Sequence, residues 1–143
     1  MPITSSRHLN KGDKIEVLRD EGLWFPATVL RSSETRKGKI YVEFENLTSG
    51  EDKRLREYIT PAEVRPVPPQ ELHSFFKVGD IVDAFSVNAW CRGEVVDILE
   101  NSMYCVLIGG EKCEIEQWNL RPHRDWDDGS WVPPLAHQVF DEM

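Results

Sequence analysis

An internal repeat constrains this chain more than any other feature of its sequence. Segments 11–18 and 78–85 both carry a Gly-Asp followed by alternating apolar residues. Three further blocks recur in the same order, and they pair Trp24 with Trp90, Tyr41 with Tyr104 and Arg65-Pro66 with Arg121-Pro122. The distance between the copies falls from 67 residues at the Gly-Asp to 56 at the Arg-Pro, as shortening of the loops between the apolar blocks would cause. We therefore interpret the chain as two copies of one small module.

Each copy has the apolar spacing of half-buried β-strands. Ile15 alternates with charged neighbours, and Ile40, Val42 and Phe44 alternate with polar ones. A period of two predicts strands rather than helices. Thr60-Pro61-Ala62-Glu63 predicts one helical turn, because threonine is a good N-cap and proline suits the first helical position. A sheet this small exposes its edges unless it curls up, so the pattern predicts an all-β chain with two small barrels.

The repeat also sets the expected domain boundaries. We predict a first domain at 9–66, a linker at 67–76 and a second domain at 77–134, between tails at 1–8 and 135–143. Apolar residues in the linker favour packing of the two barrels on each other as one tandem unit. The segment after Pro122 carries Trp126 and Trp131, and we expect it to fold back as a lid on the second barrel.

Charge and cysteine usage narrow the function. The 143 residues carry a net charge of −8, and all of that excess lies in residues 73–143. An acidic half disfavours nucleic acid and attracts a basic partner. No apolar run has the length of a membrane span, and three cysteines without a CxxC favour neither a disulfide framework nor a zinc site. No phosphate loop or hydrolase motif is present, so we expect a binding protein without metal or cofactor, and not an enzyme. We also expect the tandem unit to be monomeric.

Two blocks carry a resemblance to a known family. They are Val-Gly-Asp-Ile-Val-Asp-Ala-Phe at 78–85, followed by Trp90, and the long block at 120–132. In these blocks the sequence resembles the plant tandem Agenet family, a Tudor-like branch of the Royal folds. The resemblance implies two SH3-like barrels that together read methylated lysine on histone tails in the nucleus. The tail it implies first is histone H3 dimethylated at lysine-9, in silenced heterochromatin.

A methyl-lysine site needs aromatic faces, because a methylated ammonium keeps its charge while gaining apolar surface. In this family such residues lie at the ends of the first and third strands and at the start of the second. The first copy would supply Trp24, Phe25, Tyr41 and Phe44, and the second copy, as the alternative, Phe85, Trp90 and Tyr104. Leu18 in one copy and Leu107 in the other interrupt a full aromatic set. The acidic candidates for binding a basic peptide are Asp20, Glu21, Glu43, Glu45, Asp83 and Asp97.

Other interpretations of these residues remain open. Aromatics in a small barrel are often core, which applies most to Phe25 and Phe44, whereas Trp24 is out of phase with Ala27 and Val29. His123 is a candidate for pH-dependent binding, because it lies beside an arginine and several acids. The alternatives to a methyl-lysine reader are a recruitment scaffold without methyl dependence, and an RNA- or DNA-binding module that uses loops 36–39 and 53–56.

Overall fold

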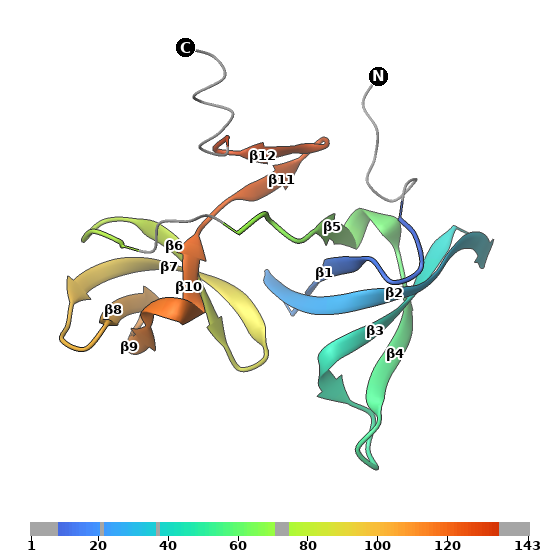
Figure 1. Ribbon diagram of the computed structural model, residues 1–143, viewed down its shortest axis with the longest axis horizontal. Helices are drawn as coiled ribbons and strands as arrows, with labels where there is room; N and C mark the ends of the chain where they lie inside the picture. The colour runs from blue at the N-terminus through green and yellow to red at the C-terminus, as the bar shows by residue number, and fades with distance from the viewer. Residues whose placement is uncertain (1–8, 21, 37, 71–74, 135–143) are drawn as a thin grey trace. The chain divides into compact units, whose positions relative to one another are not determined.

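The two copies of the repeat form two separate β modules in the computed structural model (Figure 1). The structure describes residues 9–20, 22–36, 38–70 and 75–134, with only the backbone for 32–36. One compact unit contains the chain up to Pro68 together with the segment from Asp125, and the other contains Pro69–Arg124. Both expected tails, Glu21, Lys37 and residues 71–74 of the expected linker lie outside the described residues.

The first module is an antiparallel sheet with the strand order β5-β1-β2-β3-β4. Its strands are β1 (Lys14–Arg19), β2 (Leu23–Arg36), β3 (Lys39–Thr48), β4 (Arg54–Ile59) and β5 (Val64–Pro66). The expected alternation is confirmed, because Ile40, Val42 and Phe44 are buried while the residues between them are partly exposed. The inward-facing residues of all five strands form the core of this module.

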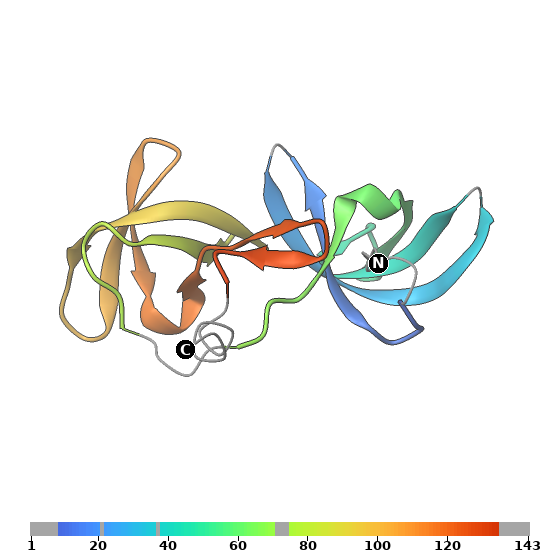
Figure 2. The same cartoon turned by 90° about the horizontal axis from the view of Figure 1, so that it is seen from above.

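The second module repeats this topology with the strand order β10-β6-β7-β8-β9. Figure 2 shows its strands from a second side, coloured from yellow-green to orange. Its strands are β6 (Ile81–Ser86), β7 (Ala89–Ile98), β8 (Met103–Ile108), β9 (Glu111–Glu116) and β10 (Leu120–Pro122). The core of this module consists of Phe76, Val82, Ala84, Val95, Tyr104, Val106, Ile115 and Leu120. A register shift follows Val29 in the first module and Val95 in the second, at matching positions of the repeat. The predicted all-β class is therefore confirmed.

A single 3-10 turn precedes the last strand of each module. It is η2 (Pro61–Glu63) in the first and η3 (Gln117–Asn119) in the second. The helical turn predicted at Thr60–Glu63 is thus present, with its proline in the first turn, although the Thr60 side chain forms no capping hydrogen bond. Among the described residues, no helix is long and apolar enough to cross a membrane.

The register of the third strand corrects the sequence alignment of the two copies. Val29 lies opposite Val42 in the first module, and its counterpart Val95 lies opposite Val106 in the second. Tyr104, two residues before Val106, therefore matches Ile40, and the expected match with Tyr41 is wrong by one residue. Because a shift of one residue reverses the face of the sheet, Tyr104 is buried while Tyr41 lies on the outside.

The C-terminal hairpin corrects a second expectation. Strands β11 (Asp125–Asp127) and β12 (Ser130–Val132) pair with each other, and the Trp126 and Trp131 ring centroids lie 4.8 Å apart. The hairpin belongs to the first unit, so the prediction of a lid on the second barrel is wrong. The physical reason is Arg65 of β5, whose guanidinium lies 5.3 Å from the Trp131 ring centroid and gives that ring a cation to pack on.

Candidate functional site

A buried arginine in the first module stacks on a candidate cage residue. The Arg65 guanidinium carbon lies 3.9 Å from the Trp24 ring centroid. Its Nε donates a hydrogen bond to Glu16 Oε1 at 2.9 Å, and its Nη2 lies 2.8 Å from the same oxygen. The side chains of Glu16 and Arg65 are each only 1% exposed. One face of Trp24 is therefore already occupied by a cation of the protein itself.

The second module contains the same arrangement. The Arg121 guanidinium carbon lies 3.9 Å from the Trp90 ring centroid, and Arg121 Nε donates to Asp83 Oδ2 at 3.3 Å. Asp83 and Arg121 occupy the repeat positions of Glu16 and Arg65. Our sequence reasoning missed this triad of carboxylate, tryptophan and arginine. The signal was present, because the acid and the Arg-Pro recur in both copies together with the tryptophan.

Two of the first copy's candidate cage residues are core residues. Phe25 and Phe44 are buried, and their rings meet edge to face with centroids 6.4 Å apart. The Arg19 guanidinium lies 5.1 Å from the Phe44 ring centroid, and it donates to Glu57 Oε1 at 3.2 Å. A ring with no exposed surface has no face for a ligand. The structure therefore corrects the cage assignment of Phe25 and Phe44 in favour of the core interpretation.

Tyr41 does not join these residues. Its ring lies on the outer side of β3, where its centroid is 4.6 Å from that of Tyr58 on β4. Strand alternation directs the Tyr41 side chain away from Phe44. Trp24 is also on the outer side, as its phase relative to Ala27 predicted, so the four aromatics of the first copy form no common cage.

The second copy keeps an aromatic pair that is partly open. Phe85 on β6 lies directly opposite Trp90 on β7, and their ring centroids are 5.1 Å apart at an interplanar angle of 62°. Both side chains are partly exposed. The first module has Leu18 opposite Trp24 at the matching position, so it lacks one of the two rings. Among the candidate cage residues, Phe85 and Trp90 are therefore the two whose rings are in contact and also partly exposed.

Tyr104, the third aromatic expected in this set, belongs to the core. It is 4% exposed, and its ring centroid lies 5.7 Å from that of Phe76 in an edge-to-face contact. The Phe76 backbone N–H donates a hydrogen bond to the Tyr104 hydroxyl at 3.3 Å. A buried tyrosine needs such a partner for its hydroxyl, and Phe76 of the expected linker provides it.

The acidic candidates of the first copy form surface ion pairs. Glu43 lies 3.0 Å from Arg56 and 3.7 Å from Arg54, and Glu45 lies 3.5 Å from Lys14. Asp20 is exposed in the turn after β1, where its φ of 50° is in the left-handed region. Glu43 and Glu45 lie on strand β3, and Asp20 lies in the turn after β1.

Asp83 and Asp97 in the second copy have different surroundings. Asp83 is buried and binds Arg121, and its Oδ1 lies 2.7 Å from His123 Nδ1. Asp97 is exposed, and its side chain accepts a hydrogen bond from the Ile98 N–H at 2.8 Å. His123 is therefore placed against a buried carboxylate in the second module, while the pH dependence expected of it stays a prediction.

Cys91, next to Trp90 in β7, has a perturbed thiol. Burial raises its pKa, and the nearby charges of Asp83 and Cys113 raise it further. The Cys91 thiol is therefore protonated at neutral pH, and the side chain behaves as a small apolar residue. Among the described residues, no group of three or more His, Cys, Asp or Glu side chains is placed to hold a metal ion.

The first module matches a known domain family, and the chain has relatives in Arabidopsis thaliana. The family model of the Agenet domain matches residues 12–69, which is the first module. The Arabidopsis thaliana protein named AGENET DOMAIN (AGD)-CONTAINING P1 is 32% identical over 143 residues, covering 90% of this chain and 28% of that protein. DUF724 domain-containing protein 6 from the same plant is 30% identical over 125 residues, covering 83% of this chain and 17% of that protein. The chain thus spans less than a third of the length of these relatives.

Solved structures extend the similarity to both modules. The crystal structure of ADCP1 tandem Agenet domain 3-4 has a TM-score of 0.78 and 30% sequence identity, and the match covers 92% of each chain. The structure of Arabidopsis thaliana AGDP1 AGD34 has a TM-score of 0.80 at 30% identity, covering 91% of this chain and 92% of that one. These folds are SH3-like binding modules. The matched first module and the near-complete match to tandem Agenet structures show that the chain belongs to the Agenet domain family.

Proposed function

We propose that this chain is a nuclear chromatin reader that binds a histone tail carrying a methylated lysine, with histone H3 dimethylated at lysine-9 as the first candidate. The proposal rests on one observation above all, the partly exposed Phe85–Trp90 pair in the second module. Membership of the Agenet family supports it, since the resemblance implies a methyl-lysine reader. The site assigned to the ligand is the Phe85–Trp90 pair.

The chemistry of the ligand fits this pair. A methylated ammonium is attracted to an aromatic face by the ring quadrupole, by about 0.5–2 kcal/mol when water is excluded. The two rings meet edge to face at 62°, so they present partly exposed aromatic surface in two orientations. Arg121 occupies one face of Trp90, so Phe85 is the ring whose substitution tests the ligand site most directly.

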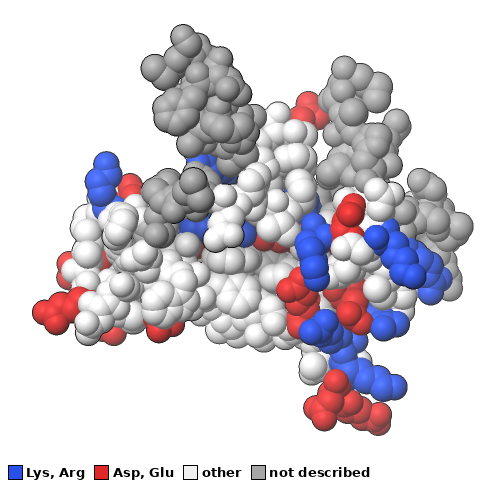
Figure 3. All heavy atoms as spheres, viewed as in Figure 1, with Lys and Arg blue, Asp and Glu red and all other residues white. Residues whose placement is uncertain are grey.

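The charge of the second module also suits a basic peptide. Exposed carboxylates follow β7 and β9 and the turns beside them, at Glu94, Asp97, Glu100, Glu111, Glu114 and Glu116. Figure 3 shows acidic side chains on the visible face of this module. Exposed carboxylates raise the rate of association with a cationic peptide and contribute less to final affinity. The peptide backbone and its basic residues would lie along these strands.

The first module is a weaker candidate for the same ligand. Phe25 and Phe44 are buried, and Trp24 carries the guanidinium of Arg65 on one face. The same guanidinium lies 5.3 Å from the Trp131 ring centroid, so Arg65 is a protein cation that already contacts two aromatic rings. This supports the second copy over the first as the reader site.

The test is a calorimetric titration of histone H3 peptides centred on lysine-9 and carrying no, one, two or three methyl groups. We expect methyl-dependent binding near the micromolar range for the wild-type chain. Phe85→Leu gives the second module the residue type that the first has at this position, and it should weaken binding of the dimethylated peptide about tenfold. Leu18→Ala is the matched control in the first module, and it should leave the affinity unchanged.

Two outcomes would contradict the proposal in different ways. Equal affinity for all four peptides would indicate a scaffold that recruits its partner without reading methylation. Methyl-dependent binding that survives Phe85→Leu but is lost in Trp24→Ala would place the site in the first module. Circular dichroism of each variant shows whether its fold is retained.

A further inference from the structure

We propose that the outer face of β2, β3 and β4 in the first module binds single-stranded nucleic acid. The face consists of two tyrosines and three cations, and we call it the tyrosine face: Arg31, Lys39, Tyr41, Arg56 and Tyr58. This function is separate from the histone site proposed above, because it uses a different module and none of the same residues.

Three of these residues form a row across the sheet. The strand register places Arg31 of β2 opposite Tyr41 of β3, and Tyr41 opposite Tyr58 of β4. The Arg31 guanidinium lies 4.9 Å from the Tyr41 ring centroid, and the two tyrosine centroids are 4.6 Å apart at an angle of 36°. The row is therefore a continuous stack of one guanidinium and two aromatic rings.

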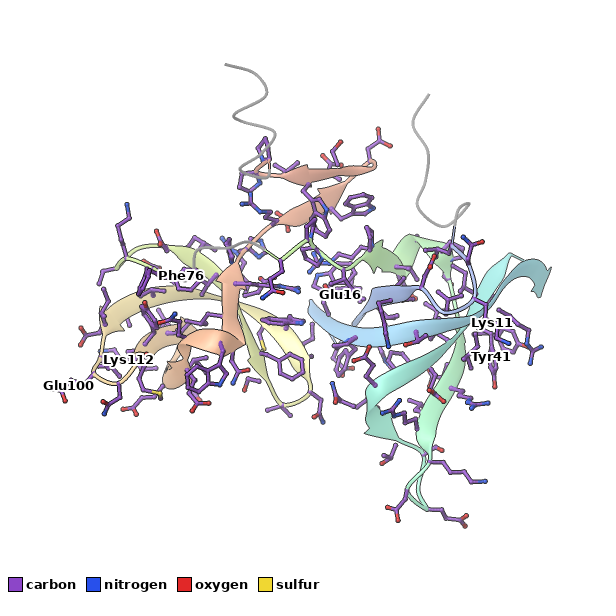
Figure 4. All side chains as sticks on the ribbon, in the orientation of Figure 1. Lys11, Glu16, Tyr41, Phe76, Glu100 and Lys112 are labelled. Atoms are coloured by element: carbon purple, nitrogen blue, oxygen red, sulfur yellow. The ribbon has the colours of Figure 1, made fainter. Side chains whose placement is uncertain are left out.

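The row lies on the surface and not in the core. Ile40 and Val42, which flank Tyr41 in sequence, are buried, so the tyrosine points to the opposite side of the sheet. Figure 4 shows the labelled Tyr41 among side chains on the outer side of the first module. Arg31 is exposed and both tyrosines are partly exposed, so all three side chains of the stack have surface that solvent can reach.

Two further cations flank the row. Lys39 precedes Tyr41 by two residues on β3, and Arg56 precedes Tyr58 by two residues on β4, so each shares the outer face. Both side chains are exposed. Figure 3 shows many Lys and Arg side chains on the visible face of this module, with Asp and Glu side chains among them. Three cations around two rings give the face a local positive charge, although the whole chain is acidic.

Glu43, an acid on this side of β3, does not cancel that charge. Glu43 lies 3.0 Å from Arg56 and 3.7 Å from Arg54, so one carboxylate is shared by two guanidinium groups. Beyond it, a surface hollow of about 510 Å³ continues along the same two strands. Its lining is rich in cations and consists of Glu43, Ser49, Lys53, Arg54, Leu55 and Arg56.

This combination fits a single strand better than a duplex. Single-stranded nucleic acid binds where bases stack on aromatic rings or arginine planes while cations contact the phosphates. In a duplex the bases are paired and their faces are covered, so the Arg31–Tyr41–Tyr58 stack would have nothing to stack on. The expectation that disfavours nucleic acid was drawn from the acidic half of the chain, residues 73–143, and this surface lies on the other half, which has no net charge.

The test is fluorescence anisotropy of the full chain with fluorescein-labelled oligothymidine and oligouridine of about 15 nucleotides. Three phosphate contacts to a single strand give a slope near −2 in a plot of log K against log salt. Affinity should therefore fall about 20-fold between 50 and 200 mM KCl. A duplex of the same length should bind more weakly than either single strand.

Matched variants separate the tyrosine face from the total charge. Lys39→Glu and Lys112→Glu make the same change in net charge, but Lys112 is an exposed residue on β9 of the second module. Lys39→Glu should weaken oligonucleotide binding at least fivefold and reduce the salt slope, while Lys112→Glu should leave both unchanged. Tyr58→Leu removes a ring without changing charge, and it should weaken binding about tenfold. Arg31→Ala is a second variant of the row with little effect on the core.

Four results would overturn the proposal. They are no salt-dependent binding of either oligonucleotide, equal loss in the Lys39 and Lys112 variants, full binding by both Tyr58→Leu and Arg31→Ala, or tighter binding of the duplex. The histone-peptide titration is run on the same variants as an independent readout. Lys39→Glu should keep wild-type peptide affinity, so a failure of the reader function and a failure of this proposal are distinguishable.

Discussion

Matching side chains in the two modules have different surroundings, and this decides what each can do. Arg65 lies near the rings of two tryptophans and is almost fully buried, whereas Arg121 stacks on Trp90 and keeps some exposure. A guanidinium that stacks on an aromatic ring occupies the face that a ligand cation would otherwise contact. In the first module Arg65 therefore occupies one face of Trp24, whereas the second module retains Phe85 as a ring without such a cation among the described residues.

The turn before Trp90 contains a valine in an unfavourable conformation. Val87 has a φ of 54° and is 84% exposed, and the next residue, Asn88, has a φ of 72°. A two-residue hairpin turn with positive φ at both residues favours Asn-Gly, and a β-branched residue such as valine is strained in that conformation. We expect Val87→Asn to raise the free energy of unfolding by about 1 kcal/mol, measured by urea denaturation.

Another exposed valine provides the control for this prediction. Val78 is 61% exposed, and its φ is not in the left-handed region. Val78→Asn should change the free energy of unfolding by no more than about 0.5 kcal/mol. If both substitutions have the same effect, the gain at Val87 comes from removing an exposed apolar side chain and not from relieving backbone strain.

The raised pKa of Cys91 predicts how its alkylation depends on pH. The thiolate is the reactive form, so raising the pKa lowers the reactive fraction at any pH below it. The rate of reaction with iodoacetamide at Cys91 should keep increasing with pH above the ordinary thiol range. Mass spectrometry of the Cys91 peptide after timed labelling measures this rate.

The same peptide in denaturant is the internal reference. Unfolding removes burial, the largest cause of the shift, and separates Cys91 from Asp83 and Cys113. The midpoint of the rate profile should then return to the ordinary thiol value, near pH 8.5. A profile that does not change on unfolding would contradict the assigned burial effect.

At the scale of elements, alternation and turn chemistry predicted most of the strands. The buried residues of β3 and the turn at Pro61–Glu63 follow directly from local sequence. The pairing of Tyr41 with Tyr104 was wrong, because residue identity at one position cannot reveal which face a strand presents. That face depends on where the bulge lies, and the bulges after Val29 and Val95 are set by pairing with the next strand.

A close approach between β7 and β8 gives an element-scale prediction. A Cβ placed on Gly93 would lie 2.6 Å from Val106 Cγ1 and 3.0 Å from the Leu107 carbonyl oxygen. The backbone oxygen cannot move without disturbing the sheet, so Gly93→Ala should destabilise the second module by about 1–3 kcal/mol. Thermal unfolding followed by tryptophan fluorescence measures the change.

The first module contains the natural comparison, since Ala27 holds the position that matches Gly93. Ala27→Gly should cost about 1–2 kcal/mol, because glycine increases the entropy of the unfolded chain and the buried methyl group of Ala27 is lost from the core. Gly93→Ala and Ala27→Gly thus destabilise by different mechanisms, the first by crowding and the second by loss of packing and gain of chain entropy. A stabilising effect of Gly93→Ala would show that β8 can move away from the added methyl group.

At the scale of the whole molecule, the sequence order of the two units is nested. The second module lies in the chain between Pro68 and Asp125, which both belong to the first unit. Adjacency in sequence led us to expect the Trp126–Trp131 segment on the second barrel, because that segment follows Pro122 directly. The deciding contact is with Arg65, which is far away in the sequence, and no local pattern reveals such a pairing.

Nesting predicts which module depends on the C-terminal hairpin. Trp131 is 8% exposed and lies near the Arg65 guanidinium, so Trp131→Ala leaves a cavity beside a buried ion pair. We expect a loss of about 3–5 kcal/mol, confined to the first module. Native-state hydrogen exchange reports this by module: amides of β1 and β5 should lose protection, while those of β6 and β10 should keep it.

Removing the chain after Arg124 should destabilise the first module in the same way as Trp131→Ala. The loss of protection in β1 and β5 should be larger, because the whole hairpin is then absent. Trp126→Ala is the milder comparison, since Trp126 is only partly buried and its ring packs on that of Trp131. Loss of protection in β6 and β10 instead would mean that the hairpin supports the second barrel after all. If the predicted pattern holds, the second module keeps its Phe85–Trp90 pair intact in the shortened chain, so peptide binding survives while the first module is destabilised.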